Sequence, residues 1–172
     1  MPERQPSPPP TPPMKPFRGI LSWEQVKETV ETQSLHRFSR TPEVTEAYLH
    51  HLQTNVKRFA SISDCVKVQT LHLPSFIKDE LIHAVPVDQA SGWKVKPWTL
   101  TKNRFPYAVE KGVEHWVLWS IGEKALDNLQ IQSICDREFL GLEYTFLVNP
   151  PRLKSVPEIH HVHIFFHETM NF

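Results

Sequence analysis

Residues 159–167 read Ile-His-His-Val-His-Ile-Phe-Phe-His, and this stretch decides how the second half of the chain folds. Its β-branched and aromatic residues favour a strand. Side chains on a strand alternate between two faces, so one face carries His161, His163, Phe165 and His167, and the other carries His160, Val162, Ile164 and Phe166. We therefore expect a strand that brings two or three imidazoles together on one face.

Two further segments upstream of this stretch also have strand character. Residues 115–119 (His-Trp-Val-Leu-Trp) and residues 144–148 are rich in β-formers, and the apolar residues between 126 and 139 recur at nearly helical intervals. The order strand, helix, strand, turn, strand is typical of an antiparallel sheet with helices on one face. The sequence predicts an α+β fold whose sheet-bearing part spans residues 98–172.

The first half of the domain has helix-start signals. Ser22 and Gln25 have the spacing of a capping box, Thr41 precedes Pro42 at a first helical position, and a third helix is expected after Ser63. We expect an N-terminal helical segment over residues 19–74, with the first helix ending near Leu35. The apolar stripe of the second helix comprises Val44, Ala47, Tyr48, Leu52, Val56 and Phe59.

Two segments lack clear periodicity. Residues 75–97 read as a connection, with a short helical turn near 78–83, that either covers a pocket or joins the two halves. Residues 1–18 are rich in proline and poor in apolar side chains, so we expect a disordered tail. The chain is thus predicted to be one domain, residues 19–172, behind that tail.

Composition narrows the function classes. The 172 residues carry a net charge of zero, with a pI near 7.2, so no long-range field favours nucleic acid. No apolar run reaches the length of a membrane span, and Cys65 and Cys135 lack the spacing of a zinc or redox motif. We expect a cytoplasmic protein without cofactor or membrane partner, acting on a small molecule; the sequence does not indicate its oligomeric state.

The candidate site centres on the histidines. His161 and His163 share a strand face, and His115, which opens another strand, is a third candidate. We predict apolar walls from Phe105, Tyr107, Trp116, Trp119 and Phe165. A zinc site built from the histidines is an alternative, although no helical His-Glu-X-X-His motif or cysteine pair accompanies them.

Several motifs carry a resemblance to known families. Residues 21–24 (Leu-Ser-Trp-Glu), Arg40 before a tyrosine-bearing helix, residues 103–107 (Asn-Arg-Phe-Pro-Tyr), residues 115–119 and residues 149–163 resemble the fungal N-acetylglucosamine-induced protein family, a domain of unknown function. The order of these motifs is more distantly similar to the histidine-triad superfamily. That resemblance implies His163 as a nucleophile toward phosphate, with His161 orienting it, His115 completing the histidine cluster and Asn149 at the substrate edge.

The chain also departs from the histidine-triad pattern. Phe165 stands where that superfamily has a polar residue that contacts phosphate, and Pro150, Pro151 and Pro157 offer no backbone N–H groups. Ser155 and Lys154 remain as donors. We therefore favour a repurposed pocket that assists isomerisation or cyclisation of a largely apolar organic substrate, by acid/base or hydrogen-bond chemistry. Nucleotidyl or phosphoryl transfer through His163 is one alternative, and a non-catalytic metabolite sensor or adaptor is another.

Overall fold

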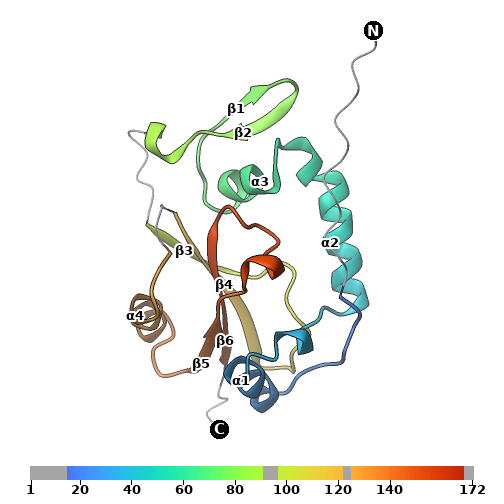
Figure 1. The fold of residues 1–172 in the computed structure, drawn as a ribbon, viewed down its shortest axis with the longest axis vertical. Coiled ribbons are helices and arrows are strands. Elements are labelled where there is room, and N and C mark those ends of the chain that lie inside the picture. The colour runs from blue at the N-terminus through green and yellow to red at the C-terminus, as the bar shows by residue number, and fades with distance from the viewer. Residues whose placement is uncertain (1–14, 91–96, 122–124, 169–172) are drawn as a thin grey trace.

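The structure is a computed structural model that describes residues 15–90, 97–121 and 125–168. Its centre is a four-stranded antiparallel sheet in the order β3-β4-β6-β5 (Figure 1). The strands are β3 (Trp98–Lys102), β4 (Val113–Ser120), β5 (Glu143–Leu147) and β6 (His160–His167). The predicted α+β class and the three predicted strands are confirmed. The sequence reasoning missed β3, although Trp98, Thr99 and Thr101 are strand-favouring residues.

The β6 residues Val162, Ile164 and Phe166 face helix α4 (Asn128–Glu138), as their alternation predicts. In this layer Ile131, Ile134 and Cys135 of α4 pack against Leu118 and the three β6 residues. Asp127 caps α4 through a capping box with Gln130. This helix supplies the expected layer on one face of the sheet.

The opposite face of the sheet is covered by the N-terminal helical segment. Helix α1 (Trp23–Glu31) buries Trp23, Val26 and Val30 in a core with Leu147 and Phe165, followed by the 3-10 turn η1 (Leu35–Arg37). The predicted capping box of Ser22 and Gln25 is present, but α1 ends at Glu31 rather than near Leu35. The chain turns there, because Gln33 takes a left-handed backbone conformation with φ of 54°.

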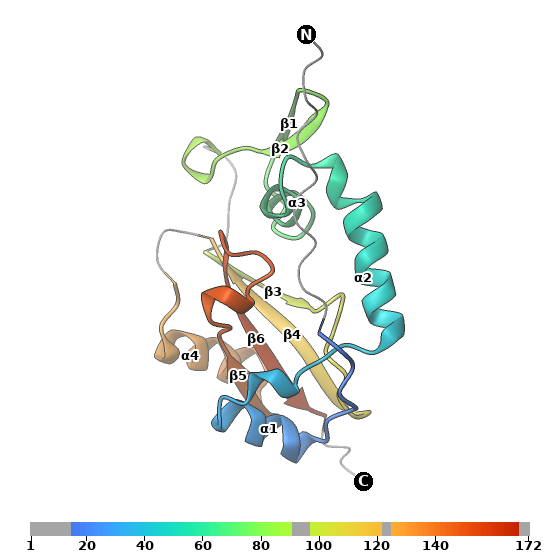
Figure 2. The same ribbon diagram turned by 45° about the vertical axis from the view of Figure 1, so that its right-hand side comes forward.

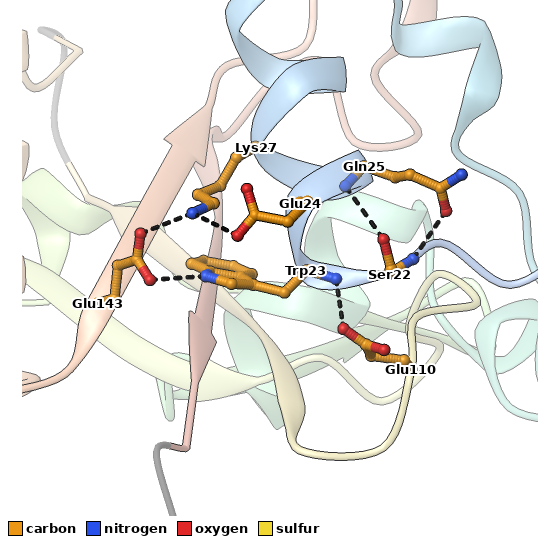
Figure 3. Close-up of polar contacts among 7 residues, drawn as sticks. All are labelled: Ser22, Trp23, Glu24, Gln25, Lys27, Glu110 and Glu143. Carbon is orange, nitrogen blue, oxygen red and sulfur yellow. Dashed lines mark hydrogen bonds and ion pairs between the residues drawn. The ribbon is translucent and has the colours of Figure 1, made fainter.

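Polar contacts fasten α1 to the sheet (Figure 3). The Trp23 indole Nε1 donates to Glu143 on β5 at 2.8 Å, and Lys27 Nζ lies 2.8 Å from the other oxygen of the same carboxylate. The Trp23 backbone N–H donates to Glu110, in the loop that precedes β4. Trp23 thus links α1 to strand β5 and to the loop that precedes β4.

Helix α2 (Pro42–Thr54) runs along one side of the molecule (Figure 2). Thr41 caps it and Pro42 occupies its first turn, as predicted. None of its residues is fully buried, and the predicted stripe residues Val56 and Phe59 lie beyond its end, at the 3-10 turn η2 (Val56–Arg58). The helix is therefore available to form a cavity wall as well as a core layer.

Helix α3 (Ile62–Gln69) begins after its cap Ser61, close to the predicted start. The prediction of a helical turn near 78–83 is wrong, because β1 (Ser75–Lys78) and β2 (Leu81–Ala84) form an antiparallel hairpin. Asp79 and Glu80 both have positive φ, which is the backbone geometry of a tight two-residue hairpin turn. The 3-10 turn η3 (Val87–Gln89) follows.

The hairpin is attached to α3 and does not close over the sheet (Figures 1 and 2). The Ala84 N–H donates to the Asp64 carboxylate at 2.8 Å, and the Ala60 N–H donates to the Ile82 carbonyl at 2.9 Å. Of the expected proline-rich tail, residues 1–14 lie outside the described residues. The Arg18 backbone N–H donates to Ser39 Oγ at 2.9 Å.

Candidate functional site

Two neighbouring strands position the three candidate histidines. On β6, His163 stands opposite Val117 of β4 and His161 stands opposite Trp119. His115 of β4 lies diagonally across from His163, and His115 Nε2 is 2.9 Å from His163 Nδ1. All three imidazoles are on the sheet face that α1 covers in part, and all three are buried. The predicted convergence of histidines on this face is present in the fold.

Backbone hydrogen bonds determine where the protons of the histidine pair lie. The Tyr107 N–H donates to His115 Nδ1 at 3.0 Å, so that nitrogen carries no proton and His115 must be protonated at Nε2. The Asn103 amide nitrogen is 3.2 Å from Nε2, but an amide nitrogen accepts no hydrogen bond. The His115 Nε2–H therefore donates to His163 Nδ1.

The same reasoning extends to Asn149. Because His163 accepts at Nδ1, its neutral ring is protonated at Nε2, which lies 3.0 Å from the Asn149 side-chain amide. Only the amide oxygen accepts such a bond, and the two ends of an amide exchange by a half-turn. A series of hydrogen bonds thus runs from Tyr107 through His115 and His163 to Asn149, and each residue donates to the next one. Both ring nitrogens of His115 and of His163 are engaged within it.

Electrostatics keeps these two rings neutral. Burial lowers the pKa of His163 to about 3, with further lowering by His161, Arg40 and Lys15. Burial, together with His163 and Arg40, holds the pKa of His115 well below its ordinary value. Neither ring takes up a proton readily, so the chain of hydrogen bonds is stable in its neutral form near pH 7.

His161 differs from the other two histidines. Its Nδ1 lies 2.8 Å from the Ile159 carbonyl oxygen, which only accepts, so Nδ1 carries the proton. The Nε2 atom of the neutral ring is left with a lone pair, and no hydrogen bond among the described residues engages it. Burial lowers the His161 pKa, the Ile159 carbonyl opposes this, and Lys154 and His160 lower it further. His161 is therefore the histidine whose ring nitrogen is free to accept a proton.

A cavity of about 420 Å³ lies beside His161, and we call it the His161 cavity. Its walls come from α2, α3, β3 and β4 and from the loops at residues 103–105 and 155–156. Trp119 and Phe105 are on its wall, and the Trp119 ring centroid lies 5.0 Å from that of His161. The Phe105 ring contacts Tyr48 and His51 at centroid distances of 5.2 Å. The cavity combines aromatic surface with an unengaged imidazole nitrogen.

A second cavity, of about 390 Å³, lies beside His163, and we call it the His163 cavity. Asn149, Tyr107, Lys154 and Ser155 line it, together with residues of α2 and of the 3-10 turn η4 (Pro151–Leu153). The two cavities share the lining residues Arg40, Tyr48 and Ser155. They therefore adjoin each other, with one histidine of the His-X-His pair in each.

Some of the other predicted site residues line neither cavity. Phe165 lines neither cavity, because its fully buried ring stacks on Phe38 and on His115 at centroid distances of 5.1 and 4.4 Å. The prediction of Trp116 as a wall is wrong, because this residue faces the α4 side, next to Phe139 and Phe166. Strand alternation puts Trp116 on the face opposite His115. His115 lines neither cavity and contacts the site through His163.

Of the three residues that line both cavities, sequence reasoning expected only Ser155 at the site and gave no site role to Arg40 or Tyr48. The Arg40 Nε donates to the Phe105 carbonyl at 2.9 Å, and its guanidinium lies over the rings of Tyr48 and Tyr107. The Tyr48 hydroxyl is buried without a hydrogen-bond partner in the described part of the chain. The only sequence signal was the position of Arg40 before a tyrosine-bearing helix. Within the described residues, no group of three or more His, Cys, Asp or Glu side chains is arranged to hold a metal ion.

Comparisons with known proteins identify a family, a yeast relative and a solved structure of similar fold. A family model described as "Protein of unknown function (DUF3605)" matches residues 22–167. The uncharacterized protein YPL067C of Saccharomyces cerevisiae is 27% identical over 164 residues, which cover 83% of this chain and 76% of the yeast protein. The crystal structure of HTC1 is similar, with a TM-score of 0.55 and 23% identity, covering 86% of this chain and 85% of that one. At this identity the likeness shows a shared fold.

No helix in the described ranges has both the length and the apolar character needed to cross a bilayer.

Proposed function

The chain belongs to the family described as "Protein of unknown function (DUF3605)", and because that description assigns no activity, we propose a function from the site alone. The protein binds a small organic molecule in the His161 cavity and catalyses proton transfer at one of its carbon atoms, as in an isomerisation or cyclisation. His161 is the general base. The observation that carries this proposal is the Ile159 carbonyl, which places the His161 proton on Nδ1 and leaves the Nε2 lone pair without a hydrogen bond from any described residue.

The chemistry follows from the neutral imidazole. A general base must present a lone pair toward the substrate proton, and its pKa must lie low enough for the ring to be neutral before the reaction. Burial lowers the His161 pKa, so the ring meets that condition near pH 7. The proton taken from carbon resides on Nε2 and returns to another carbon of the substrate, which regenerates the neutral base. Trp119 and Phe105 offer aromatic surface for the carbon skeleton.

The substrate that we propose carries a polar group, unlike the largely apolar molecule expected from the sequence. Arg40, Lys102 and Arg104 line the His161 cavity, and no Asp or Glu from the described part of the chain does. A carbanion or enolate that forms next to a fixed guanidinium is stabilised electrostatically. Arg40, held by the Phe105 carbonyl and two tyrosine rings, is suited to this role. We therefore propose an organic substrate with both an apolar body and an electronegative or anionic group.

Phosphoryl or nucleotidyl transfer through His163 is the second candidate function, and one observation favours it. The His163 cavity is lined by Lys15, Arg40, Arg152 and Lys154, as a phosphate-handling site requires. The proton arrangement opposes it, because a nucleophilic His163 needs a lone pair at Nε2. The Tyr107 N–H donates to His115, so His115 donates to His163 Nδ1, and the proton of the neutral His163 ring lies on Nε2. The resemblance to the histidine-triad superfamily and that to the N-acetylglucosamine-induced family stay proposals.

Deuterium exchange tests the proposed proton transfer even when the product is unidentified. The purified protein is incubated in D₂O with a library of small organic acids, ketones and aromatic metabolites, and mass spectrometry detects a gain of one mass unit. We expect exchange into at least one compound, with a loss of about 100-fold or more in His161→Gln. His50→Gln, which changes an exposed histidine of α2 that lines neither cavity, is the matched control. Equal exchange by His161→Gln and the wild type would remove His161 as the base.

A further inference from the structure

The His163 cavity has an unusual balance of charge. Among the described residues, the side chains that line it include Lys15, Arg40, Arg152 and Lys154 and no carboxylate. None of the ion pairs formed between described residues involves any of these cations. Partial burial lowers the pKa of Lys15, and the charges of Arg40 and Arg152 add to this lowering. The cations repel one another across the cavity, and a bound anion would relieve that repulsion.

Two of the donors at this cavity are held in place before any ligand arrives. The Arg40 guanidinium is fixed by its Nε hydrogen bond to the Phe105 carbonyl and by the tyrosine rings beneath it. The Asn149 side chain is buried, and its oxygen accepts from His163 in the arrangement derived above. Its amide N–H₂ then takes the place in which the structure has the amide oxygen, an atom without a hydrogen bond to the described residues, and Asn149 lines the cavity. Preorganised donors of this kind bind an oxyanion without the cost of ordering them.

A third donor is the Tyr48 hydroxyl, which lines the cavity. It is buried and makes no hydrogen bond of standard geometry within the described ranges, and the Ser155 side chain lies close enough to interact with it. A buried hydroxyl without a partner is uncommon and costs stability, unless a ligand or water supplies an acceptor. Ser155 also lines the cavity, on the loop that follows Lys154. The surroundings of the cavity therefore include charged donors and the neighbouring hydroxyls of Tyr48 and Ser155.

We propose that the His163 cavity is an anion-binding site for the phosphate group of a small organic phosphate. A dianionic tetrahedral oxyanion matches four cations better than a single carboxylate does, because it neutralises more charge and accepts from several directions. The volume of about 390 Å³ admits a phosphate together with several carbon atoms. This binding site is inferred from the residues that line the cavity and does not depend on the proposed role of His161.

The shared wall of the two cavities links this site to the proposed function. Arg40, Tyr48 and Ser155 border both cavities. On the premise that His161 is the general base, one substrate places its phosphate beside Arg152 and Asn149 and its exchangeable carbon-bound proton beside His161. The substrate class is then an organic phosphate whose carbon chain reaches past Arg40.

The binding site is tested by NMR on the full chain, with inorganic phosphate and pyrophosphate as probes and with potassium chloride at equal ionic strength as reference. We expect saturable shifts of the Asn149 side-chain amide and of the backbone amides of Lys154 and Ser155. Arg152→Gln, an exposed residue on the 3-10 turn η4, is expected to weaken phosphate binding about tenfold. Lys111→Gln, which removes an exposed cation that lines neither cavity, is expected to leave the affinity unchanged.

Three outcomes overturn the proposal. The first is that the Asn149, Lys154 and Ser155 signals show no saturable shift. The second is that Lys111→Gln weakens phosphate binding as much as Arg152→Gln does. The third is that the protein binds acetate more tightly than phosphate. His161→Gln separates this proposal from the proposed function. That variant is expected to bind phosphate like the wild type and to lose deuterium exchange, so failure of either result identifies which of the two ideas is wrong.

Discussion

The neutral state of His163 predicts that acid destabilises this protein through one identifiable group. The folded-state pKa of His163 is about 3, against an ordinary value of 6.5. Between these values the unfolded chain binds a proton that the folded chain refuses. The contribution of His163 to stability is therefore fully present above pH 6.5 and is lost as the pH falls toward 3.

The magnitude follows from the two pKa values. Each pH unit below 6.5 costs about 1.4 kcal/mol, so His163 alone removes about 2 kcal/mol of folding free energy at pH 5. The lowered pKa values of His115 and His161 add losses of the same sign. For a domain of ordinary stability, this is a substantial fraction of the total.

Urea denaturation at a series of pH values between 7 and 5 measures this effect. Gln at position 163 still accepts the His115 hydrogen bond but does not titrate. We expect His163→Gln to be less stable than the wild type at pH 7, and this difference to shrink by about 2 kcal/mol at pH 5. His36→Gln controls for loss of an exposed imidazole. A difference between His163→Gln and the wild type that stays constant from pH 7 to pH 5 would refute the buried, neutral state of His163.

Two further changes test the packing that supports the site. Ser22→Ala removes the N-cap of α1 and is expected to cost about 1 kcal/mol in urea denaturation; a loss below about 0.3 kcal/mol would contradict the capping role. Phe165→Ala empties a fully buried ring position next to His115 and is expected to cost about 3 to 5 kcal/mol, whereas Leu129→Ala, at a side chain that is 78% exposed, is expected to be nearly neutral. Similar losses for these last two variants would show that Phe165 is not a core residue.

The sheet face that carries the histidines was predictable from the sequence. Alternation along residues 159–167 placed His161 and His163 on one side and Ile164 and Phe166 on the other, and the core formed with α4 agrees. Cap residues also predicted where α1 and α2 begin. These features depend on neighbours within a few residues along the chain, so local physics decides them.

The hairpin β1–β2 shows where local signals failed. The residues at its turn, Asp79 and Glu80, are not the Asn-Gly or Asp-Gly pair that marks such turns. Its attachment to α3 comes from Asp64 and from the backbone of Ala60, which lie 20 and 22 positions from their partners Ala84 and Ile82. Contacts at that separation stabilise strands whose own periodicity is weak.

Phe165 illustrates the same limit within the site. Its position two residues after His163, on the same strand face, predicted a place at the substrate, yet its ring is stacked between Phe38 and His115. Phe38 lies 127 positions earlier in the chain, and nothing in either local sequence indicates the contact. The placement depends on where the N-terminal segment crosses the sheet.

By itself, the sequence determined which side chains alternate on the β6 strand and which residues cap the helices, because both depend on backbone geometry over a few positions. Only the tertiary structure decided which histidine nitrogen is free. That outcome depends on the Tyr107 N–H and the Ile159 carbonyl, whose directions are set by the fold. The cationic cavity is likewise a tertiary product, because Lys15, Arg40 and Arg152 are distant in sequence and lie close together only once the chain has folded. Charge summed over the whole chain is zero and so conceals their local concentration.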